Sequence, residues 1–78
     1  MTKVYASRDP AAFPAEQTVR EHGGFYIATT QDGVMFAQQG SGFEIVAVVN
    51  EEHIEILHNS VTTMTYDDMF DLLVWATQ

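Results

Sequence analysis

Alternating apolar and polar positions in the middle of the chain predict two paired β-strands. Apolar residues dominate the odd positions of Phe43–Val49, and the isoleucines of His53–Asn59 occupy even positions. A two-residue loop, either Asn50-Glu51 or Glu51-Glu52, brings these two sets onto one face, whereas a three-residue loop separates them. The face that we expect the strands to present to the core carries Phe43, Ile45, Ala47, Val49, Ile54 and Ile56. The opposite face is mixed rather than polar and needs partial cover, because it carries Val46, Val48 and Leu57.

Turn signals predict a second hairpin over Gly24–Gln39. Its two runs, FYIATTQ and VMFAQQ, flank Asp32-Gly33, a dipeptide that suits a type I′ turn. Before this hairpin, Pro14 suits the first position of a helix and Gly23 suits the residue just past its end, so we expect a short helix over Pro14–His22. Earlier still, Val4-Tyr5 could lie in a short edge strand.

The last segment of the chain predicts an amphipathic helix that starts after Thr65. Thr65 suits the N-cap, and Asp68 three residues later forms a variant of the capping box. At about 100° per residue, a broad apolar sector collects Tyr66, Met69, Phe70, Leu72, Leu73 and Ala76. Trp75 falls on the acidic side instead. Either the helix frays and buries this ring, or Trp75 belongs to a surface that meets a partner.

Together these elements predict one α+β domain over residues 1–78. We expect an antiparallel sheet of about four strands, packed on one face by the C-terminal helix, with the short N-terminal helix at an edge. A single core in a chain of 78 residues rarely supplies more than about 3–5 kcal/mol. The chain has no cysteine for a disulfide or a thiolate metal site. We therefore expect stability to come from a dense core, self-association or a partner.

Charge changes this picture most, because eleven acids stand against three bases and give a net charge of −8. Residues 1–31 sum to zero, so the whole excess lies in residues 32–78, which contain no Lys or Arg. Such a balance argues against binding to nucleic acid or to an anionic membrane, since both need clustered cations. The acids of this region are Asp32, Glu44, Glu51, Glu52, Glu55, Asp67, Asp68 and Asp71.

Residue types for catalysis or metal binding are present but poorly spaced. His53 and His58 differ by an odd number and should face opposite sides of a strand, which disfavours a shared metal. The serines lack a nucleophile-elbow context, and a fold of this size should have little room for a cavity of ~300 Å³. We therefore expect no catalytic residue, no cofactor and no metal. The start of the chain has no apolar stretch suited to a signal peptide, and the longest aliphatic runs are far below the ~20 residues of a membrane span. These features favour the cytoplasm.

The acidic clusters instead suggest a mimic of the nucleic-acid backbone. Alternate residues of a strand lie ~6.6 Å apart and helical i,i+4 neighbours lie ~6 Å apart, which resembles the spacing of phosphates along a strand. We expect the partner-binding residues to be Asp67, Asp68, Asp71, Glu51, Glu52 and Glu55, with Glu44 and Asp32 as outliers. Trp75 is the expected apolar anchor, a role that Tyr66 or Phe70 could also supply. Their partner would be a basic, DNA-binding protein surface.

Two stretches carry a resemblance to a known class of proteins: NEEHIE (Asn50–Glu55) and TYDDMFDLLVW (Thr65–Trp75). In size, charge and layout the whole chain resembles the small phage-encoded anti-CRISPR proteins, in particular inhibitors of type I surveillance complexes such as type I-C. These proteins share no diagnostic motif. The resemblance implies binding to a subunit of the RNA-guided complex in the host bacterial cytoplasm, which blocks target DNA. The alternative is a homodimeric or adaptor module that uses the mixed face of Val46, Val48 and Leu57.

Overall fold

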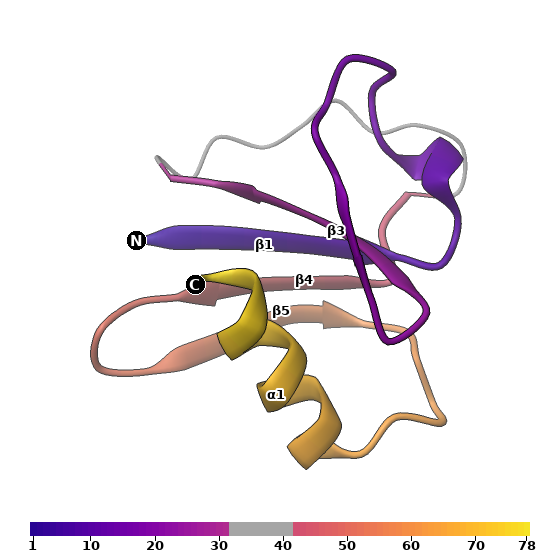
Figure 1. Cartoon of the computed structure of the whole chain (residues 1–78). Coiled ribbons are helices and arrows are strands. Elements are labelled where there is room, and N and C mark those ends of the chain that lie inside the picture. Colours follow the sequence, from indigo (N-terminus) through magenta and orange to yellow (C-terminus); the bar gives the residue numbers. More distant parts are fainter. Residues whose placement is uncertain (32–41) are drawn as a thin grey trace.

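A computed structural model of the chain describes residues 1–31 and 42–78. In these residues, five strands form one antiparallel sheet in the order β2-β3-β1-β4-β5, and one helix packs across it (Figure 1). The elements are β1 (Thr2–Ser7), the 3-10 helix η1 (Pro10–Ala12), β2 (Arg20–His22), β3 (Phe25–Thr30), β4 (Ile45–Val49), β5 (Ile54–Asn59) and helix α1 (Tyr66–Ala76). The α+β class and the C-terminal helix are confirmed, but the described sheet has five strands rather than about four.

Strand β1 lies in the centre of the sheet, so the prediction of an edge strand at Val4-Tyr5 was wrong. β1 pairs with β3 on one side and with β4 on the other, in both cases antiparallel. Its last four residues are buried, with Val4 in the core beneath α1 and Tyr5 in the core of the opposite face. Because both faces are covered, β1 lacks the apolar–polar alternation that marks an edge or half-exposed strand.

The helix that we predicted over Pro14–His22 does not form, and part of that segment is strand β2. Gly23 and Gly24 have φ of 60° and 86°, and they join His22 to its strand partner Phe25. Two central residues with positive φ are what a two-residue type I′ hairpin requires. The glycines therefore connect two strands rather than end a helix. The one helical turn nearby is η1, where Pro10 follows the N-cap Asp9, whose side chain accepts the Ala11 N–H.

The β4–β5 hairpin has the register that the apolar pattern predicted. Val49 pairs with Ile54 and Ala47 pairs with Ile56, which corresponds to a Glu51-Glu52 loop. The Asn50 N–H donates to the His53 carbonyl over 3.1 Å. A register shift between Val46 and Ala47 marks a bulge in this pair. The second strand of the hairpin predicted over Gly24–Gln39 lies outside the described residues, whereas its first strand is β3.

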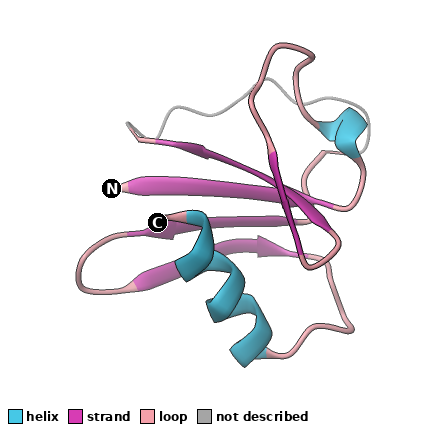
Figure 2. Cartoon of the chain, in the orientation of Figure 1, coloured by secondary structure: helices cyan, strands magenta, loops and turns pink. Residues whose placement is uncertain are grey.

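The sheet carries an apolar core on each face. Below α1, the buried core comprises Val4, Ala6, Phe25, Ile27, Ile45, Ala47, Val61, Met69, Leu72, Leu73 and Ala76. On the other face a smaller cluster comprises Tyr5, Ala12, Phe13, Ala28 and Phe43, which brings in the segment around η1 (Figure 2). We had predicted that Phe43 shares a face with Ile45, but the two lie on opposite faces of the sheet. Phe43 precedes β4, and its ring lies 4.9 Å from that of Tyr5 and 5.1 Å from that of Phe13.

Helix α1 begins where the capping pattern placed it. The Thr65 side chain accepts the Asp68 N–H over 3.1 Å. Of the predicted apolar sector, four residues are buried, but Tyr66 and Phe70 are exposed. That part of the prediction was wrong, because the sheet covers only the arc of the helix that Met69, Leu72, Leu73 and Ala76 occupy.

Candidate partner-binding surface

The three cations of the chain are all engaged within the fold, and Arg8 forms an ion pair with Glu44. Its Nη2 donates to Glu44 Oε1 over 2.7 Å, its Nε donates to Oε2 over 3.0 Å, and its backbone N–H donates to Oε2 over 2.8 Å. In the described ranges this is the one salt bridge. The hydrogen bonds from the Arg8 guanidinium hold the pKa of Glu44 below its ordinary value. Glu44 therefore already has a cationic partner within the chain, which makes it less available to another protein.

Arg20 and His22 pack on Trp75, which is only partly exposed, and its role as an apolar anchor stays a prediction. The Arg20 guanidinium carbon lies 4.3 Å from the centre of a Trp75 ring, and the His22 ring stacks on Trp75 with centroids 4.3 Å apart. Arg20 also donates from Nη2 to the Ala76 carbonyl over 2.7 Å. The helix continues past Trp75 without fraying, and strand β2 covers the ring. The remaining cation, Lys3, lies 5.7 Å from the centre of the Tyr5 ring.

Three of the predicted acids lie on the exposed side of α1. Asp67 and Asp68 belong to its first turn, where carboxylates interact favourably with the helix dipole. Asp71 lies one turn further on, four residues after Asp67, at the phosphate-like helical spacing of ~6 Å. All three side chains are exposed. The helix thus retains the acid spacing that the sequence predicted.

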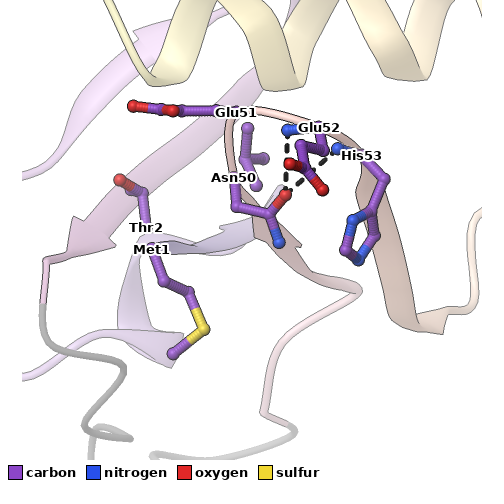
Figure 3. A pocket seen from close by; sticks show the side chains of 7 residues that line it. Met1, Thr2, Asn50, Glu51, Glu52 and His53 are labelled. Carbon is purple, nitrogen blue, oxygen red and sulfur yellow. Dashed lines mark hydrogen bonds between the residues drawn. The ribbon is translucent and has the colours of Figure 1, made fainter.

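Two further acids, Glu51 and Glu52, form the tip of the β4–β5 turn. Asn50 holds this turn, because its side-chain oxygen accepts the N–H groups of Glu52 and His53 over 3.1 and 3.0 Å (Figure 3). No described residue other than glycine has a positive φ, so the Asn50 side chain closes a turn that lacks type I′ geometry. Figure 3 shows the Glu51 side chain extending away from those of Glu52 and His53, and all three are exposed.

The structure does not bring all eight predicted acids to one face. Glu55 pairs with Val48 in the sheet, and its neighbours Ile54 and Ile56 pack toward α1, so its side chain points to the opposite face. Glu44 is paired with Arg8, and Asp32 lies outside the described residues. β5 therefore does not carry a row of acids at alternate positions, because Glu51 and Glu52 precede the strand. The acids that remain on the helix side are Asp67, Asp68, Asp71, Glu51 and Glu52.

Tyr66 and Phe70, two of the apolar anchors that the sequence offered, belong to an exposed apolar stripe on α1, whose third residue, Val74, was not predicted. Tyr66, Phe70 and Val74 are 73%, 41% and 46% exposed, and the rings of Tyr66 and Phe70 stack with centroids 6.3 Å apart. Their i, i+4, i+8 spacing places them on one ridge of the helix. The signal was present in the sequence, because Val74 lies outside the arc of the residues that we expected to be buried.

A hollow of about 430 Å³ separates this stripe from the acidic turn. Its walls come from Phe70 and Val74 of α1 and from residues 49–54, including Val49, Ile54 and the two turn acids. On the far side of the turn, an open hollow of about 640 Å³ is lined by Met1, Thr2 and residues 49–53. Both volumes exceed ~300 Å³, a size for which we expected the fold to have little room, because the projecting β4–β5 turn forms a wall for each hollow.

Chemical groups that could hold a metal do not converge in the part of the chain that the structure describes. There, no cluster of three or more His, Asp or Glu side chains has suitable geometry. Within the same residues, no helix is long and apolar enough to cross a bilayer.

Comparisons with known proteins identify no relative of the chain. No family model, no curated protein and no solved structure matches the chain. Inferences about function therefore depend on the surface described above.

Proposed function

We propose that the chain is a non-enzymatic inhibitor that binds a basic, DNA-binding surface of a protein partner through the helix-side acids. These are Glu51, Glu52, Asp67, Asp68 and Asp71. The observation that supports the proposal is the use of cations within the fold. Arg8 pairs with Glu44 and Arg20 packs on Trp75, whereas no described cation forms a salt bridge with a helix-side acid.

Such a surface suits competition with DNA. Its carboxylates would pair with Lys and Arg side chains that otherwise contact phosphates, and long-range attraction would speed association at low salt. In keeping with the resemblance to anti-CRISPR proteins, the partner that we propose is a subunit of a type I surveillance complex, with type I-C as the first to test. Binding there would block target DNA.

The test is displacement of labelled target DNA from the purified complex. Replacing Asp67, Asp68 and Asp71 with Asn should raise the inhibitory concentration at least ~10-fold. The matched control changes Glu16, Glu21 and Glu55 to Gln, which alters net charge equally but away from the helix, and should change it less than ~3-fold. Circular dichroism would check that both variants stay folded. The check is needed because each acid lost from the first turn of α1 costs about 0.3–1 kcal/mol of stability.

Two results would refute this proposal. Equal effects of the two triple variants would show that only net charge matters. Undiminished binding at ~0.5 M salt, where screening acts within about 5 Å, would exclude an electrostatic mode. If no surveillance complex binds but another basic protein does, the acidic-surface proposal survives and the CRISPR assignment fails.

A homodimeric or adaptor module is the second candidate, and exposed Leu57 favours it. Leu57 is 48% exposed and lies in edge strand β5 beside the bulge, two residues after Glu55, the strand partner of half-buried Val48. Light scattering distinguishes this candidate, because a dimer formed through this face should dissociate on Val48→Glu. Val48 is a better site than Val46, which packs against the second core.

A further inference from the structure

The apolar stripe of Tyr66, Phe70 and Val74 is bordered by carboxylates on both sides. Around the helix, Asp67 and Asp71 each follow a stripe residue by one position, about 100° further round. On the other side, Glu51 and Glu52 line the hollow next to Phe70 and Val74. The surface is thus an apolar ridge with an acidic border on each side.

From this arrangement we propose that the stripe and its hollow bind a basic amphipathic α-helix of the protein partner. Apolar side chains of that helix would lie on the stripe and enter the hollow, and its Lys and Arg side chains would reach the acids on both borders. The inference rests on the proposed function for its electrostatic part. It adds the chemistry of the partner and replaces Trp75 by the stripe as the apolar contact.

The dimensions of the stripe fit a helix. From Tyr66 to Val74 the ridge extends about 12 Å at 1.5 Å per residue, which matches roughly two turns of a partner. Residues spaced four apart form the ridge that packs into the grooves of a second helix. The adjoining hollow of about 430 Å³ has apolar groups from Val49, Ile54, Phe70 and Val74. Such a hollow can take a large apolar side chain, as helix-in-groove recognition requires.

Charge selects this occupant over others. A second copy of the chain, docked by the same face, would bring like carboxylates together, which costs affinity. An anionic membrane or a nucleic acid would meet the same repulsion. A helix with Lys and Arg along both borders of its apolar face would instead complement Glu51, Glu52, Asp67 and Asp71.

The experiment uses the whole chain and a synthetic probe, an amphipathic peptide of leucine and lysine of about 14 residues, long enough for some three to four turns. A peptide of the same composition in scrambled order lacks an apolar face, and a leucine–glutamate peptide reverses the charge. Calorimetry would give the Kd, and amide chemical shifts would show which residues contact the peptide. We expect shifts concentrated in α1 and the β4–β5 turn, and at least ~10-fold weaker binding for both control peptides.

Substitutions separate the apolar and charged parts. Tyr66→Ser with Val74→Ser removes two exposed apolar groups and should weaken binding at least ~10-fold. Leu57→Ser removes an exposed apolar group in β5 and should change the Kd less than ~2-fold. Asp67→Asn with Asp71→Asn and Glu51→Gln with Glu52→Gln, tested as separate pairs, should each weaken binding and reduce its salt dependence.

Each outcome decides something different. Loss with the acid pairs but not with the stripe variant would overturn this inference and leave the proposed function intact. Loss with the stripe variant but not with the acid pairs would overturn both. Absence of peptide binding would overturn the inference alone. Chemical-shift changes confined to the sheet face opposite α1 would do the same. Concentration-dependent self-association abolished by the stripe variant would show that a second copy covers the stripe, and would also overturn it.

Discussion

The Arg20 guanidinium carbon lies 4.3 Å from the centre of a Trp75 ring, which ties edge strand β2 to the last turn of α1. The same guanidinium donates to the Ala76 carbonyl over 2.7 Å, one of the carbonyls that a helix end leaves without an intrahelical partner. One side chain of β2 therefore both packs on the indole and caps the helix, and His22 of the same strand adds its stacking on Trp75.

Replacing Arg20 with Ala should lower the free energy of unfolding by about 1–3 kcal/mol. The change removes a charged hydrogen bond, of about 1.5–3 kcal/mol, and a cation–π contact of about 0.5–1 kcal/mol, partly offset by the exposure of the site. Urea denaturation followed by Trp75 fluorescence measures it. Glu21→Ala, on the opposite face of the same strand, is the control. A cost for Arg20→Ala no greater than that of the control would contradict the role of Arg20.

Gly23→Ala and Gly24→Ala should each cost about 1–2 kcal/mol, because both positions have positive φ. An added Cβ would meet no atom within 4 Å at either position, so the cost is one of backbone conformation and not of packing. Gly23→Asn should cost less than Gly23→Ala, since Asn tolerates the left-handed region. Thermal melts of the three variants measure the order. Equal Tm values for the Ala and Asn variants would show that φ does not govern this turn.

Lowering the pH should remove the contribution of the Arg8–Glu44 pair to the stability of the fold. Because folding lowers the Glu44 pKa, the pair stabilises the fold at pH above the ordinary value of 4.5, and this contribution disappears as pH falls through the lowered value in the folded state. The stability difference between the native chain and Glu44→Gln should therefore be constant near neutral pH and shrink below about pH 4.5.

Urea titrations at several pH values measure that difference. Its size should be small, since the pair is exposed to solvent. Glu55→Gln serves as the control, because Glu55 forms no described salt bridge. A difference for Glu44→Gln that grows with acidification would reverse the sign that the geometry requires.

Phe13 should be essential to the second core despite its place next to a single 3-10 turn. Phe13→Ala should cost about 3–5 kcal/mol, comparable to the whole stability expected of a core in a chain this short. Phe13→Leu should cost about 1 kcal/mol and stay folded. Near-ultraviolet circular dichroism would report loss of packing around Tyr5 and Phe43. A cost below 1 kcal/mol for Phe13→Ala would mean that this face is not closed by Phe13.

The parts of the fold that could be predicted are those whose pattern is local. The β4–β5 register followed from which residues alternate, and α1 followed from Thr65 and its 3.6-residue period. β1 could not be placed, because its partners Thr29 and Ala47 lie far along the chain, and burial on both faces erases the alternation. β2 was missed because Gly23 suits a helix end as well as a turn, and only the second glycine favours the turn.

The candidate surface was predicted in part, for a similar reason. The acids of α1 and of the β4–β5 turn could be located from their local elements. It could not be predicted from the sequence which acid a cation would neutralise, since Arg8 and Glu44 are distant along the chain. The contacts of Arg20 and His22 with Trp75 could not be predicted either, because nothing local in the sequence shows that β2 approaches this ring.

The central position of β1 has a consequence for folding during synthesis. β1 emerges from the ribosome before both of its neighbours, since β3 begins at Phe25 and β4 at Ile45. Each hairpin joins strands close in sequence and can close early, whereas β1 must bridge them. Nascent chains that end between β3 and β4 therefore leave one edge of β1 bare and open to aggregation. Proteolysis of stalled chains should show protection of β1 only after β4 has emerged.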